Sequence, residues 1–472
     1  MTTSDALGVL EAGFLHLESP LTPMHVGSLS IYEGAPWRNG DGNVDIAALR
    51  SHVDSRLALL PRLRQRIVWP PGHIGRAHWV DDPDFRIEHH VLLTHLAAPA
   101  DDQTLLDFTA QVHMGLLDRS RPLWELWFVD GLADRRVALI EKIHHALADG
   151  VGGVDLALTL LDPGPSPAPS AGSVAVTTDP LPSFAQRLRT VARDEVAEQV
   201  AVIRGLAEAA IHPLKALEST RGLVAGGQTL SSDLLTSRCS LNHPIGSQRR
   251  YQVVRLSLPA VRELGHALGG TINDVVLSAV TSALRTLLTE RGEEVDHLQA
   301  LVPVSIRTET QHHELGNRVA ALVVPLPVGE ADALKRFTTV STGARSRKAG
   351  HEADLSLAMV AIPDYWPEPA LAAVSQLIHH QTTVNLVVTN VPGPPMPLYL
   401  CGARLLETAP IVPLAGNLTL SIGILSYDHQ LTFGIFADDS VDDLDVLAGG
   451  IVAGVAELQA MVDAHGAPEV TP

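Results

Sequence analysis

The alternation of apolar and polar positions divides the first half of the chain into amphipathic helices and short strands. Apolar residues recur at spacings of three and four behind aspartates, which predicts helices over 46–60, capped by Asp45, and over 105–116, capped by Asp101 or Asp102. Runs of Val, Ile, Leu, Trp and Phe over 124–130 and 136–143 predict two adjacent strands around a turn at Asp130-Gly131. The second strand leads directly into His144-His145, and a helix is expected over 151–161.

The second half repeats this mixture of helices and strands. A strand is predicted over 251–258, followed by a helix that Pro259 opens and Gly269-Gly270 closes, and then by a helix capped by Thr271. Further strands are predicted over 301–306, 319–326, 384–389, 418–425 and 431–436, with a turn at 427–429 and a closing helix from Leu444 to Leu458. The pattern predicts an α/β or α+β fold with mixed sheets in two domains.

A stretch rich in Pro, Ser, Ala and Gly separates the two halves. Residues 162–183 have the composition of an extended connector. We therefore predict an N-terminal domain over 1–162, a linker over 163–183 and a C-terminal domain over 184–472. The helical pattern that follows the linker is interpreted as a surface helix, because a membrane-lying helix would need a more basic polar face.

Composition and charge narrow the possible partners and compartment. The 472 residues are 46% hydrophobic, enough for two or three core-bearing units, and the net charge of -19 argues against nucleic acid as a partner. Cys239 and Cys401 form no CxxC motif, which fits a reducing cytoplasm. The N-terminus lacks the basic region of a secretory signal, and no apolar run reaches the length of about 18 residues that spans a bilayer. We expect a cytoplasmic protein, soluble or peripherally attached to lipid.

The motif with the clearest chemical meaning is HHxxxDG, which runs from His144 to Gly150. Transfer of an acyl group to an alcohol needs a base that removes the hydroxyl proton, and imidazole suits that task near neutral pH. Asp149 would hold the turn rigid, and Gly150 would let a ligand arm pass close to the backbone. Three other histidine pairs lack the xxxDG that follows this one, and they lie at 89–90, 312–313 and 379–380.

Other kinds of site find little support in the sequence. Adjacent histidines at a strand end point in opposite directions, and neither HExxH nor a Cys/His cluster accompanies them, so we predict no metal site. There is no GxSxG elbow for a nucleophilic serine, and no Walker or GxGxxG motif for a nucleotide. Direct attack by the acceptor, without a cofactor or a covalent acyl-enzyme, is the mechanism that remains.

HHxxxDG in this setting resembles the CoA-dependent acyltransferase superfamily, and further motifs are similar to those of the bacterial wax ester synthase/acyl-CoA:diacylglycerol acyltransferase family. These motifs span nearly the whole chain and are MHVG at 24–27, PLWE at 122–125, NDVVL at 273–277, PVSIR at 303–307, LGNR at 315–318 and TNVPGP at 389–394. The resemblance implies two chloramphenicol-acetyltransferase-like domains joined by a long crossover, with a tunnel between them. It favours the second histidine, His145, as the base.

The resemblance also suggests roles for residues in the second half. Asn273 would bind the thioester oxyanion at the start of its helix with Asp274 beside it, although both could simply cap that helix. Arg307 would form an ion pair with Asp149 between the domains, with Arg318 as the rival partner. Asn390 and Gly393 would shape a wall of the tunnel.

A few residues and several properties stay open at this point. Pro122 and Trp124 are expected to pack and fix a turn, and His25, alone on its strand, is read as structural. Three functions compete: an acyltransferase that uses acyl-CoA and diacylglycerol or a long-chain alcohol, a transferase supplied by a carrier protein, and a non-catalytic lipid-binding or lipid-droplet protein. The first explains the intact HHxxxDG best and implies association with a membrane or lipid-droplet surface. Acyl length, acceptor preference and oligomeric state are left open.

Overall fold

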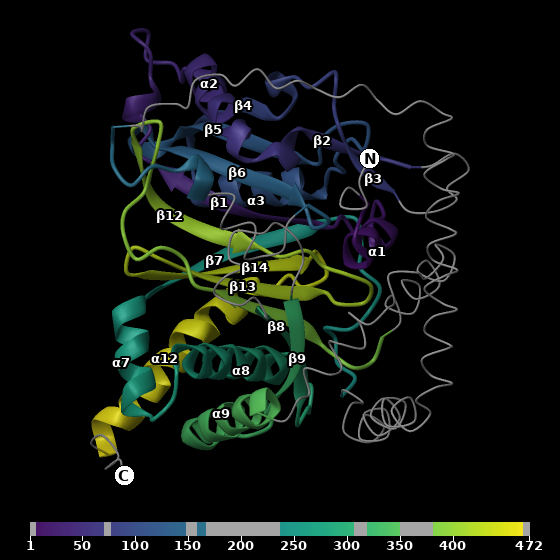
Figure 1. The fold of residues 1–472 in the computed structure, drawn as a ribbon. Coiled ribbons are helices and arrows are strands. Elements are labelled where there is room, and N and C mark those ends of the chain that lie inside the picture. The colour runs from purple at the N-terminus through teal and green to yellow at the C-terminus, as the bar shows by residue number, and fades with distance from the viewer. Residues whose placement is uncertain are drawn as a thin grey trace, which may run out of the picture.

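Two six-stranded sheets organise the described part of the chain (Figure 1). The structure is a computed structural model that describes residues 6–69, 77–147, 158–166, 237–305, 319–349 and 381–465. The first sheet has the order β11-β12-β1-β6-β5-β4. In that order, its strands are Tyr399–Leu400, Ala403–Ile411, His25–Tyr32, Val137–His144, Trp124–Leu132 and Val91–Ala100. The helices of this half are α1, α2 and α3, at Val9–Leu17, Ile46–Arg56 and Asp102–Met114, and β2 (Gln65–Val68) and β3 (His78–Asp81) form a small separate ribbon.

The second sheet carries most of the remaining elements. Its strand order is β7-β14-β13-β10-β8-β9. In that order, its strands are Arg249–Ser257, Gln430–Asp438, Leu420–Tyr427, Leu386–Val391, Leu298–Ser305 and Val319–Leu326. Helices α7, α8, α9 and α12 pack in this half, at Leu258–Ala267, Ile272–Glu290, Ala333–Ala349 and Leu444–His465 (Figure 1). One large apolar core, which includes Leu277, Leu284, Phe433 and Ile451, joins the helices to the sheet.

A strand from late in the chain completes the first sheet. β12 pairs antiparallel with β1, with Ser30 opposite Thr408, and β11 continues from its other edge. In Figure 1 this yellow-green strand lies beside the purple and blue strands of the N-terminal half. The linear domain division at 162 and 184 stays a prediction, but residues 399–411 belong structurally to the first sheet. The two halves are therefore joined through β12 as well as through the connector.

Helix caps explain where several predicted helices begin. Asp45 accepts a hydrogen bond from the Ala48 N-H, and Asp101 accepts one from the Thr104 N-H. Thr271 and Asp274 form a reciprocal capping box at the start of α8. The local sequence therefore predicted these helix starts correctly.

One predicted turn lies elsewhere in the structure. β5 continues through Asp130 and Gly131 to Leu132, and the chain reverses over Ala133–Arg135 instead. Asp134 and Arg135 there have positive φ angles of 56° and 57°. Asp130 stays in the strand because Arg38 donates two hydrogen bonds to its carboxylate, a partner from far away in sequence. The predicted turn at 427–429 is present, with φ angles of 40° at Asp428 and 67° at His429.

By length and composition, one described helix, α12, could cross a membrane, and the bent pair α7 and α8 would provide a second candidate. Asp445, Glu457 and Asp463 interrupt the apolar residues of α12. Gly450 and Gly454 of α12 lie directly against α8, where a Cβ atom would come within 3 Å of α8 atoms. One face of α12 thus packs closely against α8 in the core.

Candidate active site

His144, the last residue of β6, and His145, which follows it, point to opposite faces of the first sheet. Strand β6 pairs with β1 so that His144 lies opposite His25, and the ladder continues with the His145 N-H donating to the Met24 carbonyl at 2.8 Å. Successive side chains of a strand alternate between faces. His144 is fully buried beneath the sheet, whereas His145 is half-buried on the other side. Only His145 is therefore placed where a substrate could reach it.

The imidazole of His145 is covered on one side by a phenylalanine from α1. The rings of Phe14 and His145 stack with centroids 3.9 Å apart and an angle of 11° between their planes. Stacked aromatic rings attract each other by about 0.5–1.5 kcal/mol beyond their buried area. Phe14 therefore holds the imidazole in one orientation.

We expect Phe14→Leu to lower kcat by about three- to tenfold, which corresponds to the loss of one such ring contact. Leucine keeps the apolar cover but cannot stack, so the imidazole would sample other orientations. Steady-state kinetics would measure the effect, with Phe85→Leu as the control, because Phe85 stacks on His90 and not on His145. Equal kcat values for Phe14→Leu and the unaltered protein would contradict a positioning role for Phe14.

Beneath the sheet, Glu18 anchors the turn that carries His145. The His144 Nδ1 atom accepts a hydrogen bond from the Ala146 N-H at 3.0 Å, so in the neutral ring the proton lies on Nε2, which is 3.3 Å from Glu18 Oε1. The same carboxylate oxygen is 3.2 Å from His25 Nε2, and Arg119 donates to the other oxygen at 2.8 Å. We call Glu18, His25, Arg119 and His144 the Glu18 cluster. This cluster fixes the tautomer and position of His144. Because His145 is the next residue, its backbone is held in place as well.

The charge of Glu18 is stabilised by these partners. Burial alone would raise the pKa of this carboxyl, but the contacts with His144 and His25 outweigh it and hold the pKa well below its usual range. Glu18 is therefore an anion at neutral pH, with 2% of its side chain exposed. A buried anion with several donors is a rigid anchor for the strand ends around it.

A second buried group, His113 of α3, lies next to the Glu18 cluster. Its carbonyl contacts His25 Nδ1 at 3.2 Å, and its ring is buried close to Lys142 and His25. Burial lowers the pKa of His113 well below its ordinary value near 6.5, and the nearby Lys142 and His25 act in the same direction. The His113 ring is therefore neutral in the folded protein.

This buried ring predicts a dependence of stability on pH. As the pH falls below about 6.5, the unfolded chain takes up a proton at His113 that the folded protein does not, so the free energy of unfolding decreases. We expect the melting temperature of His113→Gln to fall less than that of the unaltered protein when the pH is lowered from 7 to 5.5. Calorimetry at the two pH values would test this. Equal losses would mean that His113 titrates alike in both states.

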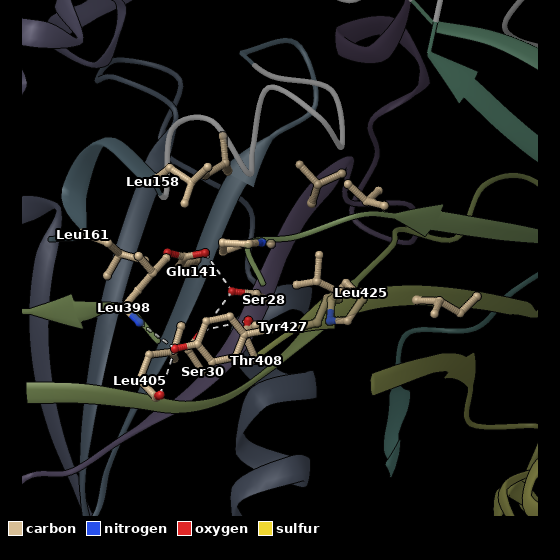
Figure 2. Close-up of a pocket in the computed structure, with 18 of the residues that line it drawn as sticks. Ser28, Ser30, Glu141, Leu158, Leu161, Leu398, Leu405, Thr408, Leu425 and Tyr427 are labelled. Carbon is tan, nitrogen blue, oxygen red and sulfur yellow. Dashed lines mark hydrogen bonds between the residues drawn. The ribbon is translucent and has the colours of Figure 1, made fainter. Parts of the chain in front are cut away.

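A cavity of about 120 Å³ lies between the two sheets on the His145 face of β6 (Figure 2). β1 lines it with every second residue from Val26 to Tyr32, and β6 lines it with Glu141 and Ile143. β12 adds Pro410, which pairs with Ser28, and Val412 follows that strand. The opposite wall is mostly apolar and is formed by Thr389, Val391, Pro394, Ile424 and Leu425. His145 follows Ile143 by two residues, so it belongs to the same face, beyond the Ile143 end of the residues that line the cavity.

Two predicted site residues from distant motifs meet at the start of α8. The Asn390 side chain of β10 donates to Asn273 Oδ1 at 3.5 Å. Thr389 and Val391 on either side of Asn390 line the cavity, so Asn390 itself points to the other face of β10. Gly393 has no room for a side chain, since a Cβ atom would lie 2.2 Å from the Ser426 carbonyl oxygen. The TNVPGP motif therefore forms the cavity wall and also supports Asn273.

Asp274, Pro122 and Trp124 have structural partners. The Asp274 carboxylate accepts from the Thr271 N-H and hydroxyl at 2.8 and 2.9 Å, which accounts for it as a helix cap. Trp124 is buried, donates from Nε1 to the Leu63 carbonyl at 2.7 Å and stacks on His90. Pro122 is buried in the turn before it. Leu123 between them accepts a hydrogen bond from the His144 N-H, so this turn supports the end of β6.

Several sequence-based predictions cannot be placed. Asp149 and Gly150 of HHxxxDG, Arg307 and Arg318 lie outside the described residues, and so do most of the linker and the helix expected after it. Within the described ranges, no group of three or more His, Cys, Asp or Glu side chains could hold a metal ion. The ion pair between Asp149 and Arg307 stays a prediction.

Three residues near the site were missed or undervalued from the sequence: Phe14, Glu18 and Glu141. Glu18 follows the last residue of α1 and lies seven residues before His25, and an acid at the end of this mostly apolar helix was the available signal. His25 was read as structural, and its contacts within the Glu18 cluster agree with a supporting role. Nothing in the local sequence indicates that Phe14 would lie on His145, because that contact depends on how α1 packs.

Comparison with known proteins agrees with this architecture and with the motifs. Residues 7–276 match the family model of the wax ester synthase/diacylglycerol acyltransferase catalytic domain, and residues 315–459 match the model of its C-terminal domain. The chain is 35% identical over 471 residues to a probable diacylglycerol O-acyltransferase, tgs1, of Mycobacterium tuberculosis, with 96% of each chain covered. A second relative from that organism, the probable diacylglycerol O-acyltransferase tgs2, is 31% identical, with 95% of this chain and 97% of the relative covered.

Solved structures show the same fold. The wax ester synthase/diacylglycerol acyltransferase of Marinobacter aquaeolei superposes with a TM-score of 0.69 at 25% identity, covering 97% of this chain and all of the other. A starter condensation domain of rhizomide synthetase superposes with a TM-score of 0.56 at 16% identity, over 97% and 95% of the two chains, and shares the fold alone. The expected two-domain α/β architecture is thereby confirmed, and the chain belongs to the wax ester synthase/diacylglycerol acyltransferase family.

Proposed function

We propose that this chain is an O-acyltransferase that moves a fatty acyl group from acyl-CoA to the hydroxyl of diacylglycerol, and that it also accepts a long-chain alcohol. The observation that carries the proposal is the position of His145. Its imidazole lies at the end of β6, on the face that lines an apolar cavity between the two sheets, and Phe14 and the Glu18 cluster hold it there. The named relatives are acyltransferases, which supports this chemistry for the chain.

The reaction needs one base and no covalent acyl-enzyme. His145 removes the proton from the acceptor hydroxyl while the oxygen attacks the thioester carbonyl. The tetrahedral intermediate then collapses, the carbon-sulfur bond breaks, and the proton on His145 passes to the CoA sulfur. The products are an ester and free CoA. The protein supplies no cofactor or metal in this scheme, because acyl-CoA is itself a substrate.

Two other functions are less well supported. A transferase supplied by a carrier protein would share the fold, but the relatives of highest identity reported above are named as diacylglycerol O-acyltransferases. A non-catalytic lipid-binding protein would have no need of a half-buried histidine held by a stacked ring and a buried anion. The acyl-CoA-dependent reaction therefore fits the site best.

We also propose that the protein works in the cytoplasm at a membrane or lipid-droplet surface. The support is the insolubility of diacylglycerol and of long-chain alcohols, since the substrate must be taken from a lipid phase. Co-sedimentation of the purified chain with triolein droplets coated with phosphatidylcholine would test this. Protein that stays entirely in the aqueous fraction would contradict surface attachment.

The decisive assay uses the purified full-length chain with labelled palmitoyl-CoA. One reaction contains dioleoylglycerol and the other hexadecanol, and the labelled triacylglycerol or wax ester is quantified. Transfer to either acceptor supports the proposed function, and the ratio gives the acceptor preference. A folded protein that binds palmitoyl-CoA but produces neither ester would favour the lipid-binding alternative.

The position of Asn273 in the first turn of α8 leads to a prediction for the oxyanion. If the Asn273 amide stabilises the negative oxygen of the tetrahedral intermediate, Asn273→Ala should lower kcat about ten- to a thousandfold. Thermal unfolding should change little, because Thr271 and Asp274 cap α8 and remain in place. A mutant with reduced stability and unchanged kcat would make Asn273 a structural residue only.

A further inference from the structure

A row of hydrogen-bonding side chains crosses the otherwise apolar cavity. Ser28 donates to Glu141 Oε2 at 2.7 Å, the Ser28 and Ser30 hydroxyls are 3.3 Å apart, and Ser30 donates to Thr408 Oγ1 at 3.0 Å. These four residues come from three adjacent strands, β6, β1 and β12, and Figure 2 shows them on one side of the cavity with the hydrogen bonds dashed. We call them the Glu141 ladder.

The ladder is unusual because polar side chains in an apolar cavity are costly. A carboxyl or hydroxyl removed from water destabilises the fold unless it is hydrogen-bonded. Burial raises the pKa of the Glu141 carboxyl above its usual range, and the hydrogen bond from Ser28 only partly opposes that shift. Ser28 donates a hydrogen bond to one carboxyl oxygen of Glu141, and among the described residues no hydrogen bond reaches the other oxygen. Glu141 therefore has capacity for a further partner on the cavity side.

The position of the ladder indicates which part of a substrate it would meet. Ser28 lies opposite Glu141 in the β1-β6 register, and Glu141 precedes His145 by four residues on the same face. With a rise of about 3.3 Å per residue, the ladder lies about 13 Å from the base along the strand. The ester carbonyls of diacylglycerol are only a few bonds from the reacting hydroxyl, so they would stay near His145. The ladder would instead meet the middle of a long hydrocarbon chain.

The shape of the cavity agrees with a chain that runs along the strands. On β1 the residues that line the cavity extend from Val26, which pairs with Ile143, to Tyr32, which pairs with Val137. That is a length of about 20 Å along the strand. Ser28 and Ser30 lie in the middle of this length, with apolar residues such as Leu398 and Leu405 around them (Figure 2).

We propose that this cavity selects lipid chains that carry a hydroxyl group part-way along their length, and that this hydroxyl forms a hydrogen bond with Glu141. The inference rests on the proposed function, because it places the reacting end of the lipid chain at His145. The oxygenated chain can come from the acyl group of the donor or from the acceptor alcohol. Both sources present the same chemistry to the ladder.

Donor competition with the full chain tests the proposal directly. The donors are 10-hydroxystearoyl-CoA, 2-hydroxystearoyl-CoA and stearoyl-CoA, each with dioleoylglycerol, and a second arm compares octadecane-1,10-diol with octadecan-1-ol as acceptors of palmitoyl-CoA. We expect kcat/KM to be at least about tenfold higher for the mid-chain hydroxyl in one of the two arms, because a buried partner discriminates strongly for the group it binds. The arm that shows the preference identifies the source. The 2-hydroxy donor should show no preference, since its oxygen stays near His145.

The matched variants are Glu141→Met, which removes the hydrogen bond at similar volume, and Glu141→Gln, which retains a side-chain oxygen that can accept one. The tenfold ratio should fall to about one in Glu141→Met and be largely retained in Glu141→Gln. If Glu141→Met alone fails to fold, the double variant Glu141→Met with Ser28→Ala removes both partners of the bond and should fold. Its ratio should likewise be about one.

Two results would overturn the inference. Equal kcat/KM values for substituted and plain chains in both arms of the unaltered protein would do so, and so would a preference that persists in folded Glu141→Met or in the double variant. The plain stearoyl-CoA reaction keeps this outcome separate from the proposed function. If stearoyl transfer proceeds and the ratio is one, only the selection by Glu141 fails, whereas the absence of transfer with every donor means that the proposed function fails.

Discussion

Replacing His145 by alanine should lower kcat for acyl transfer about a thousandfold or more, with the protein still folded. The acceptor hydroxyl is a poor nucleophile until its proton is removed, and water in an apolar cavity does not replace a positioned imidazole. The half-buried ring contributes little to the core, so the melting temperature should change by only a few degrees. Labelled palmitoyl-CoA with dioleoylglycerol measures the rate.

The matched control for this prediction is His89→Ala. His89 belongs to another histidine pair but is exposed, so its removal should leave kcat within about twofold of the unaltered protein. The assignment of His145 as base is wrong if folded His145→Ala keeps more than about a tenth of the rate, since general-base catalysis contributes at least about a hundredfold.

Gly27→Ala should have the largest effect on stability, with a cost of about 3 kcal/mol or more, enough to prevent folding in a marginal protein. Gly27 lies in β1 opposite Lys142, where a Cβ atom would come within 1.8 Å of the Glu141 carbonyl oxygen. Backbone atoms cannot rotate away as a side chain can, so β1 and β6 would have to separate. The separation would begin two residues from the His25-His144 pair, beside the base.

Gly13→Ala is the control for the glycine change. Gly13 lies in α1, and a Cβ atom there would meet nothing within 4 Å. Alanine is preferred over glycine in a helix by about 1 kcal/mol, so this variant should be as stable as the unaltered protein or more so. Denaturant unfolding of both variants measures the difference. A Gly27→Ala protein as stable as Gly13→Ala would show that the strands at this point can move apart easily.

Local features of the chain were readable from the sequence. The caps at Asp45, Asp101 and Thr271, the helix starts behind them and the strand leading into His144 all depend on residues within a few positions of one another. The spacing of HHxxxDG also indicated that His144 and His145 would face opposite sides, because strand side chains alternate. The family could be recognised because its motifs are short and contiguous.

Contacts between distant residues were decided only by the tertiary structure. The insertion of β12 beside β1, the stacking of Phe14 on His145, the contact of Asn273 with Asn390, and the ladder from Glu141 to Thr408 each join residues more than 100 positions apart. Periodicity states which face a side chain is on, but not which element packs against that face. That choice depends on sheet order and on the packing of the whole core, which no local pattern encodes.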